Sequence, residues 1–421
     1  MTRQKSEAFV RLETPIPLSI HLSGGDIVLE LQGVNNQHWQ VAEHETLDSL
    51  QGQTHSFDLK YHDNAIQGSL TLNRDFLSPS DESTKSSFID FLHQVRKDQH
   101  IAICSTKDVE GSVKSNGFES IKLQPIALPE LNFCDIDIHR NFLGQRFGAP
   151  LMITGMTGGV NQAKSINERL AKAAAKFQIP MGVGSQRLAL DNPKHMDIFK
   201  LKDRYPDLFL IGNIGIGQLQ ESDHIDACKR AVEMINANCL AIHVNVLQEL
   251  IQVEGDRDFR GIINKISQIV NSLDVPVLIK EVGVGLDSQS IQKLYDVGVR
   301  HFDLGGSGGT SWAHIEGLRS NHPLISRLGT TFRDFGISTC EALQAAKSLK
   351  LVGAEFSATG GIRDGLTVLK AIHLGANMCG IGLPLLKAAL QDEDGPSDLL
   401  ETYIAELKIA MMCCGISHLK K

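Results

Sequence analysis

Charged and amide side chains stand at the ends of short apolar runs in this chain, close to glycines. Lys280 lies near the end of the apolar run 275–281. A lysine at that place would put a cation beside a pocket, where it suits the N1/O2 edge of an anionic flavin. His243 and Asn245 end another run, and neutral histidine or amide groups could face other atoms of such a ring. These residue types predict a site for an anionic, ring-containing ligand.

Glycine-rich segments follow the last two apolar runs. Residues 359–363 read TGGIR, and residues 380–382 read GIG. Backbone N–H groups in such turns, together with the N-terminus of a following helix, can converge on a phosphate. A tight turn would explain any one of these glycines, but it does not explain their recurrence after run upon run. The segments therefore predict a phosphate on a bound cofactor or substrate.

Eight apolar runs alternate with longer amphipathic stretches and must position these residues. The runs cover residues 150–154, 179–183, 208–213, 240–245, 275–281, 302–304, 354–358 and 378–382. The stretches between them cover residues 164–177, 224–237, 259–272, 287–296, 339–347 and 366–374. Strand and helix repeated over about 250 residues predict an α/β fold, a (β/α)8 TIM barrel with its chemistry in the loops after the strands. The alternative, a doubly wound sheet, carries glycine-rich turns chiefly after one strand.

The first part of the chain has a different pattern. Apolar and polar residues alternate with period two over residues 19–73, which predicts short strands. Residues 77–85 have the polar, proline-containing composition of a linker. We therefore expect a β-rich N-terminal extension over residues 1–85, without recognisable chemistry, and a barrel domain over residues 86–421.

The composition of the chain indicates which kinds of binding partner and which cellular compartment to expect. The 421 residues carry 41 Lys and Arg against 49 Asp and Glu, a net charge of −8, which disfavours a nucleic-acid binder. Charged residues interrupt both the N-terminal fifteen residues and the late apolar run 404–416, so neither a signal peptide nor a membrane span is expected. The eight cysteines are scattered and without metal-ligand spacing, which favours reduced, mostly buried thiols in a cytoplasmic protein.

An ordered series of motifs from Arg96 to the C-terminus resembles type II isopentenyl-diphosphate isomerase, the FMN-dependent enzyme family of isoprenoid biosynthesis. The motifs are Arg96-Lys97-Asp98-Gln99-His100-Ile101, Ala127-Leu128-Pro129-Glu130, Met156-Thr157-Gly158-Gly159, Gly184-Ser185-Gln186-Arg187, His243-Val244-Asn245, Gln248-Glu249, Glu254-Gly255-Asp256, Lys280-Glu281-Val282-Gly283, Gly308-Gly309-Thr310-Ser311-Trp312 and Gly360-Gly361-Ile362-Arg363. The family usually begins close to the Arg-Lys pair, whereas 95 residues precede it here.

The resemblance implies reduced FMN, Mg²⁺ and NADPH as the flavin reductant, and the interconversion of isopentenyl and dimethylallyl diphosphate. The implied flavin contacts are Gly155, Met156, Thr157, Ser185, Asn213, Lys280, Thr310, Gly360, Gly361, Ile362, Arg363, Gly382 and Leu383. The implied substrate contacts are Arg96, Lys97, Ser185, Gln186, Arg187, His243, Asn245 and Gln248. Gln248 is the implied catalytic residue at the alkene end, and Glu249 the implied Mg²⁺ ligand. A homo-oligomer that acts on a small molecule is expected.

The chemistry explains these residue types. A diphosphate is bound well by Arg and Lys, and Mg²⁺ by one carboxylate together with phosphate oxygens. Moving the double bond requires a proton to be added at one carbon and removed from another, around a cation-like centre kept from water. Gln248 is a poor proton donor, so we assign the proton relay to the reduced flavin and the orientation of substrate or water to Gln248.

Other functions remain open at this point. An FMN-dependent 2-hydroxyacid oxidase needs a histidine base and an arginine near the loop after the sixth strand, but residues 305–312 contain no histidine. A barrel of the inosine-monophosphate dehydrogenase type needs a cysteine in the same loop, and none is there. A non-catalytic flavin-binding scaffold is disfavoured because Arg187, Gln248, Glu249 and Lys280 are all retained.

Overall fold

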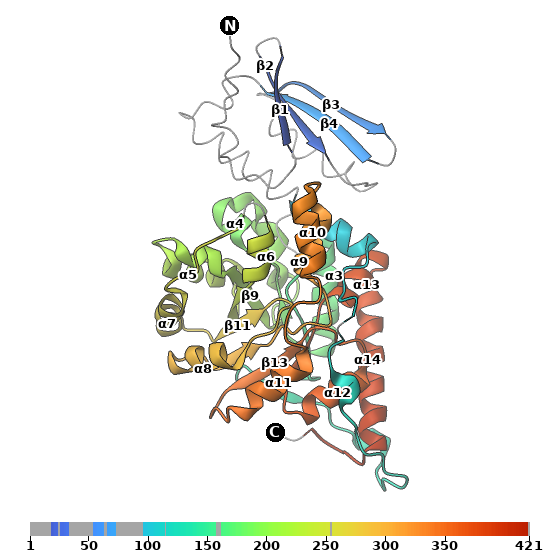
Figure 1. The fold of residues 1–421 in the computed structure, drawn as a ribbon. Helices are drawn as coiled ribbons and strands as arrows, with labels where there is room; N and C mark the ends of the chain where they lie inside the picture. The colour runs from blue at the N-terminus through green and yellow to red at the C-terminus, as the bar shows by residue number, and fades with distance from the viewer. Residues whose placement is uncertain are drawn as a thin grey trace. The chain divides into compact units, whose positions relative to one another are not determined.

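The computed structural model describes the four strands of an N-terminal sheet and residues 96–113, 115–156, 161–252 and 255–419. The four strands are β1 (Leu18–Ser23), β2 (Asp26–Gln32), β3 (Thr54–His62) and β4 (Ala65–Leu72). They pair antiparallel in the order β1-β2-β4-β3 (Figure 1). The prediction of short strands from the period-two alternation is confirmed.

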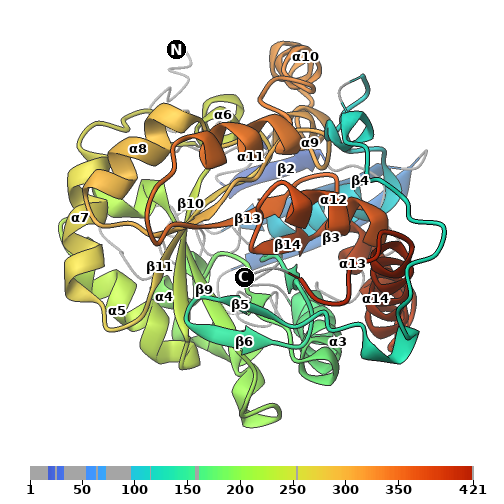
Figure 2. The same cartoon turned by 90° about the horizontal axis from the view of Figure 1, so that it is seen from below.

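Eight parallel strands form a closed barrel, as the sequence predicts (Figure 2). They are β7 (Leu151–Ile153), β8 (Met181–Gly182), β9 (Leu210–Gly215), β10 (Cys239–Val244), β11 (Val277–Glu281), β12 (His301–Asp303), β13 (Glu355–Thr359) and β14 (Met378–Ile381). Each overlaps one of the eight predicted runs. The strands are paired in chain order, and β14 pairs with β7 to close the barrel.

Helices connect these strands. The six predicted amphipathic stretches form α3 (Asn161–Phe177), α5 (His224–Ile235), α7 (Ile262–Ser272), α8 (Ser288–Asp296), α11 (Thr339–Ser348) and α12 (Gly365–His373). Further helices are α4 (Arg187–Asp191), α6 (Val246–Ile251), α9 (Trp312–Arg319), α10 (Pro323–Thr331), α13 (Leu383–Gln391) and α14 (Gly395–Cys413). Residues 96–106 are also helical. Among the described residues, no helix has the length and apolarity needed to cross a bilayer.

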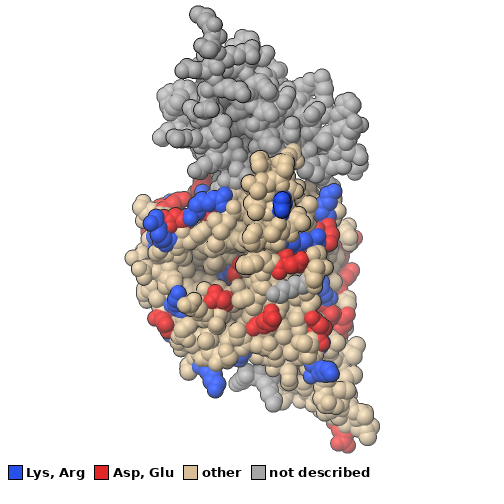
Figure 3. Space-filling view, in the orientation of Figure 1, with Lys and Arg blue, Asp and Glu red and all other residues tan. Residues whose placement is uncertain are grey.

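The chain divides into two compact units. The barrel unit comprises Cys104–Asn245, Asp258–Trp312 and Thr331–Lys421. The N-terminal unit comprises Met1–Ile103 and two later segments, Val246–Arg257 and Ala313–Thr330. Acidic and basic side chains are interspersed over the face that Figure 3 shows. The site residues of each unit are described separately below.

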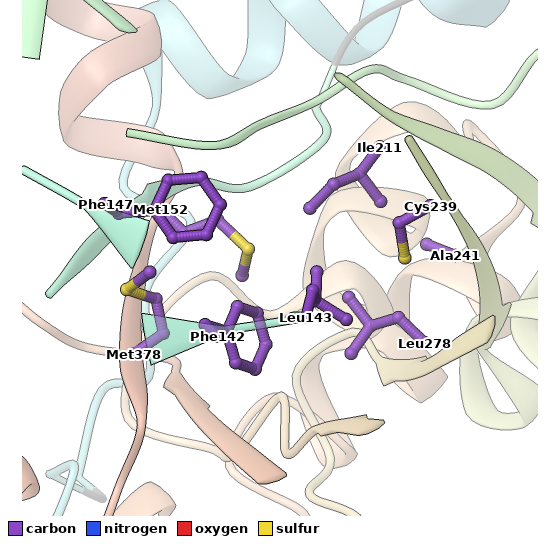
Figure 4. Packing of buried hydrophobic residues seen from close by; sticks show 9 residues of the cluster. All are labelled: Phe142, Leu143, Phe147, Met152, Ile211, Cys239, Ala241, Leu278 and Met378. Atoms are coloured by element: carbon purple, nitrogen blue, oxygen red, sulfur yellow. The ribbon is translucent and has the colours of Figure 1, made fainter. Parts of the chain in front are cut away.

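An apolar cluster fills one end of the barrel interior (Figure 4). The hairpin of β5 (Arg140–Phe142) and β6 (Gln145–Phe147) contributes Phe142, which is fully buried and lies edge-on against the ring of His301. The strands contribute Met152, Ile211, Cys239, Ala241, Leu278 and Met378. Burying each large side chain stabilises the fold by about 1.5–3 kcal/mol. Because this end is sealed, the chemistry is confined to the C-terminal ends of the strands, which we call the barrel mouth.

Candidate active site

A polar layer lies inside the barrel next to the apolar cluster. Residues two apart in a strand share a face, so the residues two positions after members of the cluster also point inward. These are Thr154, Asn213, His243 and Lys280, and Asp303 stands two positions after His301. Register pairing places His243 beside Lys280, Lys280 beside Asp303, and Asp303 beside Ser357. The fold thereby brings together polar groups that are far apart in the sequence.

His243 is held as a neutral imidazole with a fixed tautomer. The Nδ2 of Asn213 donates to the carbonyl of Val183 over 2.9 Å, which turns its Oδ1 toward His243. That oxygen can only accept, so His243 Nδ1–H donates to it over 2.9 Å. Burial, and then the charge of Lys280, lower the pKa of His243 to about 3. At neutral pH its Nε2 is therefore a hydrogen-bond acceptor.

Lys280 is a buried cation without a direct counter-ion. The residue is 9 % exposed, and no carboxylate of the described chain lies within 4.0 Å of its ammonium. Its neighbour Glu281 is engaged elsewhere: its Oε2 accepts hydrogen bonds from the N–H groups of residues 283–285 at 2.6–2.8 Å. Burial raises the pKa of Glu281 to about 7, although these three bonds and Lys280 oppose the shift. The charge of Lys280 is thus left for a ligand.

The segment Gly184–Arg187 contains one buried side chain, which packs inside the fold, and two partly exposed side chains at the barrel mouth. Gln186 is completely buried; its Nε2 donates to the carbonyl of Ala231 over 2.8 Å, and its Oε1 accepts the N–H of Asn213 over 2.7 Å. Ser185 and Arg187 are partly exposed. Since the amide of Gln186 joins β9 to α5, this residue positions Asn213 in the barrel wall.

The loop after β13 has a backbone that only glycine fits. Gly360 and Gly361 have φ angles of +114° and +72°, and a Cβ on them would lie 2.1 Å and 2.4 Å from carbonyl oxygens of the loop after β12. Within the described chain, neither N–H of these two glycines has a hydrogen-bond acceptor. Ile362 is buried, and the guanidinium of Arg363 is paired with Glu110. The loop therefore offers two backbone donors to an anion.

The start of α13 offers one further donor. Asp364 caps α12 by accepting the N–H of Thr367, whereas α13 begins after Gly382 without a side-chain cap. The N–H of Leu383 has no acceptor among the described residues and suits an anion, whereas Pro384 has no N–H and those of Leu385 and Leu386 donate to the carbonyl of Gly382. A Cβ on Gly382 would lie 3.1 Å from a methyl carbon of Thr154 and 3.5 Å from the sulfur of Met156. The turns after β7 and β14 therefore lie side by side at the mouth.

A segment that the sequence reasoning missed lies along these loops. The N–H of Gly111 donates to the carbonyl of Gly309, and the N–H of Ser311 donates to the carbonyl of Val109, which places Glu110 opposite Thr310. The side-chain amide of Asn116 donates to the carbonyl of Gly361 over 2.5 Å. These contacts fix the loops after β12 and β13. Only the Asn116-Gly117 pair, a typical turn signal, could have drawn attention to this segment.

In the N-terminal unit, a buried carboxylate holds Gln248. Glu316 has a fully buried side chain; its Oε1 accepts from Nε2 of His100 at 3.0 Å and from Nε2 of Gln248 at 2.9 Å. Its Oε2 accepts from Nε of Arg319 at 2.8 Å. Burial alone would raise the pKa of Glu316, yet Arg319, His100 and Gln248 together hold it well below its usual range. Glu316 fixes the amide of Gln248, a role that the sequence reasoning did not assign.

Glu249 lies on the next position of α6 and is partly exposed. Its Oε2 accepts the N–H of Asp256 over 2.9 Å, and a Cβ on Gly255 would lie 2.0 Å from its carbonyl oxygen. The described residues contain no group of three acidic, histidine or cysteine side chains that could hold a metal by themselves. A metal on Glu249 would therefore need ligand atoms from a bound molecule.

The structure describes all but one of the remaining predicted site residues. Arg96 and Lys97 are partly exposed on helical residues 96–106 of the N-terminal unit. Asn245 is buried directly after β10, and a Cβ on Gly155 would lie 2.1 Å from the carbonyl oxygen of Val183. Thr157 lies outside the described residues.

Comparison with known proteins agrees with this arrangement. The family model of FMN-dependent dehydrogenases matches residues 243–421. The flavin-binding domain of baker's yeast flavocytochrome b2 superposes with a TM-score of 0.57 at 17 % identity, over 77 % of this chain and 88 % of that one. A mandelate oxidase variant gives 0.51, also at 17 % identity, over 76 % and 96 %. These two structures share the barrel fold.

Relatives of higher identity define the family. The isopentenyl-diphosphate delta-isomerase of a Nostoc species is 42 % identical over 326 residues, which are 77 % of this chain and 93 % of that protein. The protein of the same name from Rickettsia bellii is 41 % identical over 333 residues, 77 % and 96 % of the two chains. With such identity over nearly the whole length of these relatives, the chain belongs to the isopentenyl-diphosphate delta-isomerase family.

Proposed function

We propose that this chain interconverts isopentenyl diphosphate and dimethylallyl diphosphate with reduced FMN and Mg²⁺, and that NADPH primes the flavin. The observation that carries the proposal is Lys280, an inward-facing cation without a direct counter-ion among the described residues. Such a cation stabilises the negative charge of a reduced flavin or of a phosphate.

The residues of the barrel mouth fit FMN. The N–H groups of Gly360, Gly361 and Leu383 suit its 5′-phosphate, and Gly382 precedes Leu383 at the start of α13. Buried hydroxyls of Thr154 and Ser307 have no hydrogen-bond partner among the described residues, which suits a polar ring edge. When bound and reduced, FMN supplies an electron-rich ring that can stabilise a cation-like centre and exchange a proton. Gly155, Met156, Thr157, Asn213, Thr310, Ile362 and Arg363 complete the proposed flavin contacts.

The diphosphate is bound by cations and by His243. Ser185, Arg187 and Asn245 are further proposed contacts, and the family resemblance adds Arg96 and Lys97. Because Nε2 of His243 is an acceptor at neutral pH, it can donate to a phosphate oxygen only after it takes up a proton. The diphosphate charge favours that proton. Substrate binding should therefore be coupled to proton uptake.

Gln248 and Glu249 act on opposite ends of the substrate. Glu316 accepts from Nε2 of Gln248, which fixes the amide, and Gln248 orients the alkene or a water. Glu249 supplies one carboxylate to Mg²⁺, and the diphosphate oxygens supply further ligands. The metal should therefore bind tightly only together with substrate.

The proposal also covers the domain boundary, the oligomeric state and the cellular compartment. We place residues 1–85 in a separate β-rich extension and residues 86–421 in the isomerase domain, and we expect a homo-oligomer. All eight cysteines are free, which suits the reducing cytoplasm. Comparing the full chain with one that begins at Ser86 tests the boundary: equal turnover is expected if the extension is not part of the active site.

Turnover assays test the proposal directly. Purified protein should carry FMN and, with Mg²⁺ and a reductant, convert isopentenyl diphosphate in amounts far above the reductant consumed. Dithionite should replace NADPH, because isomerisation moves no net electrons. Stoichiometric NADPH consumption would point to a reductase, peroxide release with lactate or glycolate to a 2-hydroxyacid oxidase, and flavin binding without turnover to a scaffold.

A further inference from the structure

A second ionisable residue in the polar layer has no part in the function proposed above. Asp303 is completely buried, and neither of its carboxylate oxygens makes a well-formed hydrogen bond to a described residue. A carboxyl group that is buried without such bonds costs stability. Its position in the barrel interior is therefore better explained by electrostatics than by packing.

The surroundings of Asp303 connect it to Lys280. The two residues are register partners on β12 and β11, and both point into the barrel. Their charges interact, although no ion pair within 4.0 Å joins them. Ser357 and Thr359 face the carboxyl group from β13, and the N–H of Gly305 also favours its charged form.

We propose that Asp303 is the buried counter-charge of Lys280, and that it sets how strongly the barrel mouth stabilises the negative charge of reduced FMN. The proposal rests on FMN binding at this mouth. An ionised Asp303 offsets part of the field of Lys280, whereas a protonated one leaves that field at full strength. Burial raises the pKa of Asp303, which Lys280, Thr359 and Ser357 partly oppose. His243, the register partner of Lys280 on β10, stays neutral, and Cys379 on β14, whose thiol interacts with Asp303, has a raised pKa, so neither carries a competing charge at neutral pH.

Asp303→Asn tests the proposal because it removes the charge and keeps the shape. The FMN-loaded variant and wild type are titrated with sulfite, which forms an anionic flavin adduct, and their two-electron midpoint potentials are measured from about pH 6 to pH 9.5. We expect the curves to approach each other as the pH falls, because protonation of Asp303 in wild type removes the charge that the variant lacks. At high pH the variant should bind sulfite about tenfold more tightly, a factor equivalent to about 30 mV.

Two further variants test whether a change in sulfite affinity and potential comes from the buried charge of Asp303. Asp296→Asn removes the same charge from the exposed end of α8 and should leave both readouts unchanged. Ser357→Ala removes a hydroxyl that favours the charged carboxylate, so it should move the pH at which the curves separate upward. It serves as the test if Asp303→Asn does not fold.

The possible results distinguish a failure of the proposal for Asp303 from a failure of the proposed function. Coincident curves at all pH values, a lower potential in Asp303→Asn, or a folded Asp303→Asn that loses FMN would overturn the proposal for Asp303. A wild-type protein that binds no FMN would instead overturn the proposed function.

Discussion

Glu316→Gln probes how the N-terminal unit fixes Gln248. The carboxylate accepts three hydrogen bonds, from His100, Gln248 and Arg319, and Arg319 itself has a side chain only 4 % exposed. Glutamine has nearly the same shape but replaces one acceptor oxygen by a donor. In the variant, one of the three donors therefore faces another donor, and the buried guanidinium of Arg319 loses its charge-assisted bond to Glu316.

The size of the effect follows from this burial. Breaking a buried ion pair by removing one partner costs about 3–5 kcal/mol, because the other charge stays desolvated. We expect the free energy of unfolding of Glu316→Gln to fall by about 3 kcal/mol at pH 7. The isomerase kcat should fall as well, because the amide of Gln248 loses its fixed orientation, whereas FMN content should be retained.

Urea unfolding of the FMN-loaded protein and steady-state kinetics measure both effects. Glu393→Gln is the matched control: it removes a carboxylate that is 67 % exposed and paired with Lys172, so it should change stability by less than about 1 kcal/mol. The double variant Glu316→Leu/Arg319→Met removes both charges and should regain most of the stability but not the kcat. A Glu316→Gln protein with wild-type stability and kcat would refute the reasoning.

Three further predictions concern the mouth and the metal. The pKa of His243 is about 3 in the fold against about 6.5 unfolded, so stability should be lost as pH falls below about 6.5. Between about pH 7.5 and pH 4.5, wild type should lose up to about 2.7 kcal/mol more than His243→Gln; equal losses in urea unfolding would contradict this. Glu249→Gln should keep the yellow flavin but weaken the Mg²⁺ requirement and substrate affinity, whereas Lys280→Ala should impair flavin retention or reduction first, by about 1.5–3 kcal/mol. The reverse pattern in absorbance and Mg²⁺ titrations would show that the roles are exchanged. Gly361→Ala should lose FMN affinity in a fluorescence titration because its Cβ meets a carbonyl oxygen, while Gly353→Ala, with the same φ of +72° and open space, should cost only about 1–2 kcal/mol of stability; equal FMN affinity in the two variants would contradict the assignment.

The barrel could be predicted from the sequence because its signals are local. An apolar run such as 378–382 is buried in a parallel strand, and β14 occupies Met378–Ile381 within it. The amphipathic stretch 287–296 predicts a helix, and the side chain of Asp287 accepts the N–H of Ser290 at the start of α8. Each of these elements follows from neighbouring residues, so the order of strands and helices could be read along the chain.

The hydrogen bonds that hold the site residues in place could not be predicted from neighbouring residues. Glu316 bonds to His100, which lies 216 positions away, and Asn116 bonds to the carbonyl of Gly361 at a separation of 245 positions. Neither contact has a local pattern. For Gln186 the local pattern suggests a ligand contact instead of a structural one, because a polar residue in a glycine-containing turn is typical of a binding site. The sequence does not tell whether such an amide points to a ligand or, as here, to Ala231 and Asn213.

The distribution of charge in the polar layer indicates which kind of ligand the barrel receives. Burial keeps His243 neutral and raises the pKa of Asp303, while Lys280 lacks a direct counter-ion among the described residues. Asp303 offsets this charge only in part, and a buried charge that is only partly compensated is unfavourable, so the fold loses stability by keeping a cation there. An anion that binds at the mouth recovers that loss. The same arrangement that weakens the ligand-free barrel therefore selects a negatively charged cofactor or substrate.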